Sequence, residues 1–352
     1  MGARRRSIVL AGAAACGLVA TVALDGQAVP APAPAREQAA AAPADRADSL
    51  AAARLAPTER VGRWLREALP GGDVDWFHYR LGSAGVVAVT LGGLPADYDL
   101  TVVDGTGRQR AASTRKGRTV DEVIVGMPAG DVLVRVTRKR RTAAGTYALR
   151  LRSLAPGFNL LSAQKTTTRG EVLGEFYNAT KKWQAVSQLD VEWLDRKGRV
   201  VKRLETFMAP ATWVRPWSRV PFVASWSMTA AEDNRSTSVR VEARLVTQDS
   251  PPKVAPLTAR VTRVETWPKT ASNPGGRAYQ GTVSNTSRRR VGTVHVYVCD
   301  YDAYGTLVTL NMTDRDYSVP AHGRRPWFTD PYGVGRWGTP SFQTVHAYEK
   351  LS

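Results

Sequence analysis

Hydrophobic and polar residues alternate along most of the chain after residue 72. The clearest alternating segments are 77–81, 87–91, 120–125, 132–136 and 147–151. A period of two residues is typical of strands with one buried face, and Gly and Pro fill the gaps between these segments. Strands at this spacing, with no long helix between them, predict an antiparallel β-sandwich or jelly roll.

The residues ahead of these strands follow other patterns. Apolar residues recur at three-to-four spacing across 48–69, which predicts a short helical segment interrupted at Pro57. Residues 29–47 are mostly Ala and Pro, with few large apolar groups to offset the entropy of ordering. We therefore predict a disordered Ala/Pro tether there.

The first 28 residues have the pattern of an export signal. Arg4, Arg5 and Arg6 precede an apolar stretch at 8–24, and Gly26 and Ala28 supply small residues at the −3 and −1 positions for cleavage after Ala28. The apolar stretch is at the short limit for a membrane span, so an uncleaved anchor is the alternative. The sequence predicts a secreted or envelope-associated protein that meets a membrane only transiently or through an uncleaved signal.

Two later segments share residues at a constant offset of 107. The matching pairs are Gly174 with Gly281, Asn178 with Asn285, Asp195 with Asp302, Gly198 with Gly305 and Val201 with Val308. An offset without gaps is typical of an internal repeat, here a hairpin-rich sandwich. We predict sandwiches at 70–154, 169–249 and 257–352, with a linker-like run at 155–168 and a boundary at Ser250-Pro251-Pro252.

The first of these sandwiches, at about 72–152, resembles the bacterial pre-peptidase C-terminal domain. The matching motifs are Asp73-Val74-Asp75-Trp76-Phe77, Leu94-Pro95-Ala96-Asp97-Tyr98-Asp99-Leu100, Gly107, Ala129-Gly130 with Val134-Arg135-Val136, and Tyr147-Ala148-Leu149. The resemblance covers less than a quarter of the chain. It implies a β-sandwich, as attached to many secreted proteases, that performs no proteolysis itself.

Some members of that family bind calcium, which implies a candidate metal cage. Its ligands would be Asp73, Asp75, Asp97 and Asp99, because Ca²⁺ takes six to eight oxygen ligands. The alternative is that these carboxylates accept hydrogen bonds from backbone amides at strand starts and turns. We favour the alternative and predict no cofactor, with calcium as the candidate to test.

The two repeated segments resemble FxLYD-type and related immunoglobulin-like domains of secreted bacterial proteins. The resemblance rests on the order Gly-x-x-x-Asn, strand, Asp, Gly, strand, beginning at Gly174 and at Gly281. The sequence departs from that pattern near Pro216-Trp217 and at 319–323, where the family has Pro-Gly and Phe. The resemblance implies a β-sandwich and no shared reaction.

The net charge of +18 and the pI near 10.3 predict attraction to polyanions. Export and the lack of helix-turn-helix, zinc-finger and RNA-binding signatures argue against nucleic acid. Anionic cell-wall polymers or a surface protein are the predicted partners. The polyanion-binding candidates are Arg115, Lys116, Arg118, Arg138, Lys139, Arg140, Arg141, Arg288, Arg289 and Arg290. Alternatively, these residues lie in basic loops that are solvated and bind no polyanion.

Nothing in the sequence indicates a reaction. There is no Gly-x-Ser-x-Gly or His-Glu-x-x-His motif, and the four histidines lack zinc-ligand spacing. Cys299, alone after the signal, predicts a buried thiol on a strand. The Trp residues between 213 and 337 are expected mainly in the cores, with exposed sugar-binding platforms as the alternative.

The sequence therefore predicts an exported, non-catalytic binding or cell-envelope protein made of tandem β-sandwiches. Basic loops are expected to bind anionic wall polymers or another surface macromolecule, and a carbohydrate ligand would require exposed Trp. The alternatives are a scaffold module that recognises proteins, or an accessory protein of a secreted hydrolase. No catalytic residue is predicted.

Overall fold

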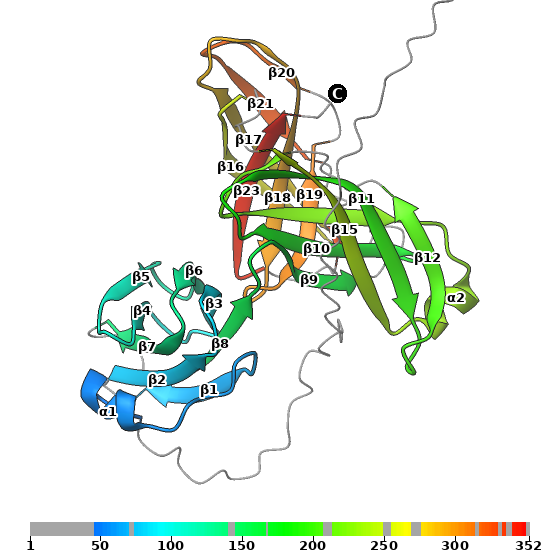
Figure 1. The fold of residues 1–352 in the computed structure, drawn as a ribbon. Helices are drawn as coiled ribbons and strands as arrows, with labels where there is room; N and C mark the ends of the chain where they lie inside the picture. Colours follow the sequence, from blue (N-terminus) through cyan, green and yellow to red (C-terminus); the bar gives the residue numbers. More distant parts are fainter. Residues whose placement is uncertain are drawn as a thin grey trace, which may run out of the picture.

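The computed structural model describes residues 46–69, 74–139, 145–166, 168–206, 213–248, 255–268, 276–313, 317–329, 333–335 and 340–349. In these ranges the chain is almost entirely β-strand, arranged in antiparallel sheets (Figure 1). The predicted fold class, tandem antiparallel β-sandwiches, is confirmed. The predicted signal at 1–28 and nearly all of the tether at 29–47 lie outside the described residues. Among the described residues, no helix is long and apolar enough to cross a bilayer.

The first sandwich consists of one short helix and eight strands. They are α1 (Leu50–Leu55), β1 (Leu65–Leu69), β2 (Val74–Leu81), β3 (Gly85–Gly92), β4 (Tyr98–Asp104), β5 (Gln109–Ser113), β6 (Asp121–Met127), β7 (Gly130–Arg138) and β8 (Gly145–Leu154). One sheet has the order β1-β8-β3-β6, and the other has the order β2-β7-β4-β5. Inward-facing residues such as Tyr79, Val89 and Leu149 are buried between the two sheets, as alternation in a sandwich requires.

The structure corrects the predicted helical segment at 48–69. Only α1 is helical there, since Pro57 lacks the amide hydrogen that a continuing helix needs. The last five residues of the segment form β1, which pairs with β8. The prediction was wrong because Leu65 and Glu67 are buried while Arg66 between them is exposed, the period of a strand.

The second sandwich contains seven strands and one short helix. They are β9 (Phe158–Lys165), β10 (Glu171–Asn178), β11 (Trp183–Leu194), β12 (Val200–Thr206), β13 (Trp213–Val214), β14 (Ser218–Ser225), α2 (Ala230–Arg235) and β15 (Ser238–Gln248). One sheet has the order β14-β10-β9; in the other, β11 pairs with β12, β13 and β15. Trp193, Phe222 and Val220 are buried between the sheets.

The third sandwich repeats this arrangement of strands. Its elements are β16 (Leu257–Trp267), β17 (Gly276–Asn285), β18 (Val291–Tyr301), β19 (Leu307–Met312), β20 (Tyr317–Val319), β21 (Arg324–Phe328), β22 (Val334–Gly335) and β23 (Phe342–Glu349). One sheet has the order β16-β17-β21; in the other, β18 pairs with β19, β20 and β23. Tyr279, Val296 and Trp327 lie in its core.

A second correction concerns the linker-like run predicted at 155–168. Residues Phe158–Lys165 form β9, an edge strand that pairs with β10. Its side chains are mostly half-buried, and Phe158 stacks on Phe176 with 4.9 Å between ring centroids. The residues Ala155-Pro156-Gly157 suggested a linker. The strand that follows them is stabilised by its pairing with β10, which begins only at Glu171.

The hairpin turns at Asp195 and Asp302 have the same geometry in the second and third sandwiches. In each turn the Asp Oδ1 accepts two backbone N–H groups at 2.8–3.0 Å. Gly198 and Gly305 close the turns with φ of 75° and 74°, a left-handed conformation that favours glycine. The matching residues in the sequence thus occupy matching places in the two hairpins.

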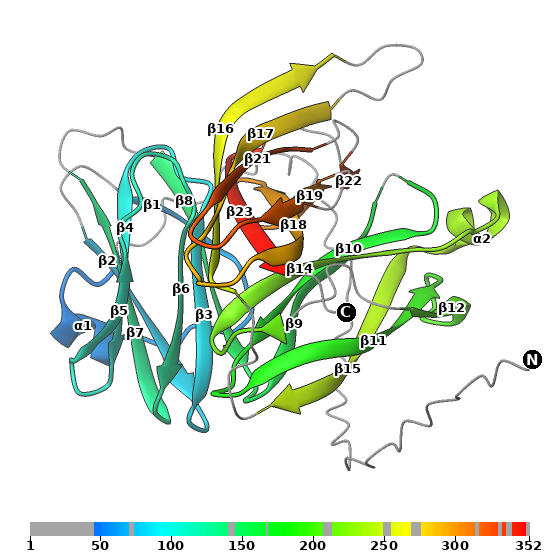
Figure 2. The same ribbon diagram turned by 90° about the horizontal axis from the view of Figure 1, so that it is seen from above.

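The three sandwiches meet at one junction (Figures 1 and 2). Arg219 on β14 pairs with Glu122 on β6 and, through Nη1, with Glu175 Oε2 on β10 at 3.2 Å. The Tyr301 hydroxyl on β18 donates to Glu175 Oε1 at 2.6 Å. Burial raises the pKa of Glu175. Residues of all three sandwiches therefore share one hydrogen-bonded ion network.

Apolar and backbone contacts reinforce the junction. Val86 and Ala88 of the first sandwich cluster with Tyr177 of the second. The β18–β19 turn docks on the first sandwich, where Gly93 N donates to Ala303 O at 2.7 Å. A Cβ on Gly92 would lie 2.5 Å from the same oxygen, so this approach requires glycine.

The prediction for Cys299 is confirmed: it is a free, buried thiol on β18. Burial raises its pKa well above the ordinary value, so the group stays a neutral thiol. The expectation that the Trp residues between 213 and 337 lie mainly in the cores was wrong: among those described, only Trp327 is buried. Trp213 is half-buried, and Trp217, Trp226 and Trp267 are exposed; Trp337 lies outside the described residues.

Candidate functional site

The four Asp residues considered as calcium ligands do not lie together where the structure describes them. Asp75 is buried and accepts a hydrogen bond from the Tyr147 hydroxyl. Asp97 and Asp99 face Lys139 Nζ at 3.8 and 3.3 Å; Asp73 lies outside the described residues. In the described ranges, no three His, Cys, Asp or Glu side chains are placed to hold a metal ion.

The two basic loops of the first sandwich begin at the same end of the β2-β7-β4-β5 sheet. Leu100 pairs with Ser113 on β5, and Tyr98 pairs with Arg138 on β7, so both loops begin beside the start of β4. The five described candidates there are Arg115, Lys116, Arg118, Arg138 and Lys139; Arg140 and Arg141 lie outside the described residues.

Three of these five cations have partners within the fold. The Arg138 side chain forms a hydrogen bond with that of Tyr98. Lys139 forms the two Asp ion pairs just described. The Arg115 guanidinium lies 5.8 Å from the centroid of the Phe342 ring, and its Nη1 donates to Val120 O at 3.1 Å. Arg115 therefore contributes to the contact between the first and third sandwiches, while Lys116 and Arg118 face solvent.

The other predicted loop, Arg288 to Arg290, precedes β18. It lies at the end of the third sandwich opposite the β18–β19 turn that contacts the first sandwich. Asn285 fixes it: its Nδ2 donates to Arg289 O (2.8 Å) and Pro320 O (3.0 Å). Its Oδ1 accepts from the Ser287 N–H and hydroxyl at 2.9 and 2.7 Å. One buried amide therefore holds the β17–β18 loop against the β20–β21 turn. This brings two basic segments together that are more than 30 residues apart.

Ser318 orients two arginines at this end. Arg290 Nε donates to Ser318 Oγ at 2.7 Å, and Arg325 Nε donates to Ser318 O at 3.2 Å. Each guanidinium is anchored through Nε, which leaves its terminal nitrogens for other partners. We call the exposed residues Arg288, Arg290, His322, Arg324 and Arg325 the arginine tip.

The arginine tip is short of carboxylates. Arg289 pairs with Glu349, with 2.7 Å between Nη1 and Oε1, and this hydrogen bond raises the pKa of Arg289. Within the described part of the chain, no ion pair is formed by Arg288, Arg290, Arg324 or Arg325. Planar guanidinium forks match carboxylate and phosphate groups in two-point contacts. The tip can therefore bind an anion without first breaking an internal ion pair.

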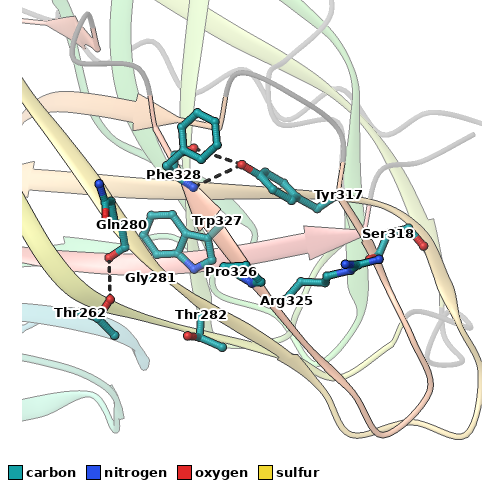
Figure 3. A pocket seen from close by; sticks show the side chains of 10 residues that line it. All are labelled: Thr262, Gln280, Gly281, Thr282, Tyr317, Ser318, Arg325, Pro326, Trp327 and Phe328. Atoms are coloured by element: carbon teal, nitrogen blue, oxygen red, sulfur yellow. Dashed lines mark hydrogen bonds between the residues drawn. The ribbon is translucent and has the colours of Figure 1, made fainter.

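A groove of about 730 Å³ adjoins the tip: Arg325 of the tip lines it, as does Ser318, which anchors Arg290 and Arg325 (Figure 3). Trp327 forms its buried floor, and the exposed Phe328 ring stands above (Figure 3). The Tyr317 hydroxyl accepts from Phe328 N at 3.2 Å. The complete lining is Thr262, Gln280, Gly281, Thr282, Tyr317, Ser318, Arg325, Pro326, Trp327 and Phe328. The groove offers hydroxyl, amide and apolar surface next to positive charge.

Sequence reasoning found the Arg288–Arg290 loop but missed the residues that complete the site. Arg324, Arg325 and Ser318 join it through the pairing of β21 with β17 and through the Asn285 hydrogen bonds. The available signal was the Arg324-Arg325 pair after Gly323, a turn residue between two strands.

No protein-family model matches the sequence, and no curated protein matches it. The solved structures to which the chain is similar include the pre-peptidase C-terminal domain of a Bacillus anthracis collagenase, at 17% identity and a TM-score of 0.24. That match covers 28% of this chain and 98% of the domain.

Two other similar structures are large enzymes. A glycosyl hydrolase family 2 member from Bacteroides cellulosilyticus has 13% identity and a TM-score of 0.28, with 72% of this chain covered. Bacteroides uniformis beta-glucuronidase 2 has 12% identity and a TM-score of 0.28, with 70% covered. The chain spans 30% and 26% of these enzymes, respectively.

Proposed function

We propose that this chain is an exported, non-catalytic binding protein that holds anionic polymers of the cell envelope at the arginine tip. The observation that carries the proposal is the pair Arg290 and Arg325. Both are anchored on Ser318 through Nε and have no ion pair in the described residues. Two fixed, unpaired guanidinium groups next to an open groove suit phosphate or carboxylate groups spaced along a polymer.

Charge and sequence pattern support the same proposal. The net charge of +18 raises the rate at which polyanions meet the surface. The Arg-rich start and apolar stretch at 8–24 support export, which would bring the protein to an envelope rich in such polymers. Lys116 and Arg118 of the first sandwich are a second exposed basic loop that a long polymer could also contact.

The proposal predicts that an Arg290→Ala/Arg325→Ala variant binds inorganic polyphosphate about tenfold more weakly than the unmodified protein. Two exposed charge contacts at up to about 1 kcal/mol each account for such a change. Titration calorimetry over a series of salt concentrations is the measurement. The slope of log affinity against log salt should become shallower by about two contacts, because each phosphate contact releases roughly one counterion.

The matched control is Arg196→Ala/Lys197→Ala, which removes the same charge from an exposed turn of the second sandwich. This control should change affinity by less than about twofold. Equal losses in both variants would mean that net charge alone drives binding, and salt-independent binding would remove the electrostatic basis of the proposal. Salt-independent binding to a surface protein would instead favour the scaffold alternative.

A further inference from the structure

The second sandwich contains the same framework that fixes the arginine tip. Asn178 Nδ2 donates to Lys182 O (2.8 Å) and Arg215 O (3.1 Å). Its Oδ1 accepts from the Thr180 N–H and hydroxyl at 3.2 and 2.7 Å. These hydrogen bonds match those of Asn285 one by one. The loop after β10 and the turn before β14 are therefore clamped together, as their counterparts are in the third sandwich.

The turn before β14 holds a tryptophan in an unfavourable backbone conformation. Trp217 has φ of 57°, and His322, at the corresponding turn of the third sandwich, has φ of 49°. In the described part of the chain these are the non-glycine residues with positive φ. A left-handed residue with a Cβ costs roughly 1–2 kcal/mol. Trp217 is 48% exposed, so burial of its ring offsets little of this cost.

Positively charged residues lie on the same turn as Trp217 and on the loop that Asn178 holds against it. Arg215 lies two residues before it, with its guanidinium 5.9 Å from the centroid of the Trp183 ring. Lys181 and Lys182 are exposed on the loop that Asn178 clamps to the turn. Neither Arg215 nor Lys181 forms an ion pair in the described ranges. A rigid aromatic face with cations beside it is suited to a ring that carries anionic substituents.

We propose that Trp217, Arg215 and Lys181 form a sugar-ring site for an acidic glycan. The ring of one sugar residue packs against the indole, and its carboxylate or phosphate contacts Arg215 and Lys181. This inference rests on the proposed function and narrows it: the anionic polymer is a glycan. At the corresponding turn the third sandwich has His322, together with the four arginines of the arginine tip. That site offers positive charge for an anion but no exposed indole for a sugar ring.

The test uses Trp217→Gly, which removes the ring and keeps the turn. Glycine adopts positive φ without strain, so the melting temperature should stay the same or rise. The probes are a polygalacturonate fragment, which has acidic sugar rings, and inorganic polyphosphate, which has none. Affinity for the polygalacturonate fragment should fall about tenfold, in line with the usual effect of removing one stacking aromatic. Affinity for polyphosphate should change by less than about twofold.

The control is Trp226→Ala, which deletes an equally exposed indole elsewhere on the second sandwich and should leave both affinities unchanged. Unchanged affinity of Trp217→Gly for polygalacturonate would overturn the sugar-ring site. Equal weakening toward both probes would overturn it too, because the indole would then not select rings. Neither result affects the arginine tip, which the Arg290/Arg325 variant tests on polyphosphate. Failure of the unmodified protein to bind either probe would overturn both proposals.

Discussion

His346 on β23 is a histidine that the fold holds in its neutral form. Its Nε2 lies 2.9 Å from Thr344 Oγ1, and its ring is nearly parallel to that of Tyr348. Burial, with a contribution from Arg219, lowers the pKa of His346 to about 4. A histidine in the unfolded chain titrates near 6.5. Between these values the unfolded chain binds a proton that the folded protein does not, so stability falls as the pH drops from about 6.5 to about 4.

We therefore expect His346→Gln to lose less stability on acidification than the unmodified protein. The difference between the two free energies of unfolding should change by about 2 kcal/mol between pH 7 and pH 4, since one pKa unit corresponds to about 1.4 kcal/mol and the ring keeps some solvent contact. Urea unfolding at a series of pH values measures it.

Asp300 produces the opposite trend in both proteins. Burial raises its pKa to about 6, so the stability it contributes is lost as the pH rises from about 4 to about 6. This is why the difference between the two proteins, and not either curve alone, reports on His346. Parallel pH profiles for the two proteins would show that His346 is not held neutral.

At the scale of elements, two strand glycines are fixed by aromatic rings packed on them. A Cβ on Gly281 in β17 would lie 2.0 Å from Arg260 O and 2.4 Å from the Trp327 ring. A Cβ on Gly174 in β10 would meet Ser162 O at 2.2 Å and the Phe222 ring at 2.5 Å. Arg260 O and Ser162 O belong to the backbone of paired strands. They cannot move away from an added Cβ as the end of a flexible side chain could.

Gly281→Ala should therefore destabilise the protein by about 2–3 kcal/mol, the usual cost of overpacking a core. The matched control is Gly292→Ala on β18, where no atom lies within 4 Å of the added Cβ. Its effect should be neutral or a slight stabilisation, since alanine reduces the entropy of the unfolded chain. Thermal unfolding of both variants is the measurement, and equal melting temperatures would contradict the close packing of β17 on Trp327.

Local patterns in the sequence predicted some elements and failed for others. Alternation at 87–91 and at 147–151 correctly placed strands, because this signal lies within the element itself. The strands β1 and β9 were missed because each depends on a partner elsewhere in the chain, β8 and β10. A short strand next to Pro or Gly has too few residues to reveal its period alone.

The sequence likewise predicted one part of the candidate site and missed another. The loop Arg288–Arg290 was identified from its own sequence, but its position beside Arg325 follows from the register of β17 with β21. The loops at Lys116 and Lys139 were also named, and the structure pairs Lys139 with Asp97 and Asp99. Charge can be counted from a sequence, whereas which charges remain unpaired depends on strand pairing between distant segments.

At the scale of the whole molecule, Arg219 links the three sandwiches. Its guanidinium, with its side chain 19% exposed, contacts Glu122 of the first sandwich and Glu175 of the second; Glu175 in turn accepts from Tyr301 of the third. Burial disfavours the charged form of Arg219, but the two carboxylates outweigh it and raise its pKa. Glu175 is almost fully buried, so removal of Arg219 would leave a carboxylate without its cation.

We expect Arg219→Met to destabilise the junction by about 3 kcal/mol, the usual cost of leaving a buried charge unpaired. The first sandwich should then unfold or move separately, so calorimetry should resolve two transitions, and trypsin should cleave faster near 150–152. The control Arg203→Met breaks a solvent-exposed pair with Glu192 on the second sandwich and should leave the unfolding transition nearly unchanged. The apolar cores between the sheets are untouched by this change, so each sandwich should still be folded below its own transition. A single unchanged transition in Arg219→Met would show that apolar contacts alone hold the three sandwiches together.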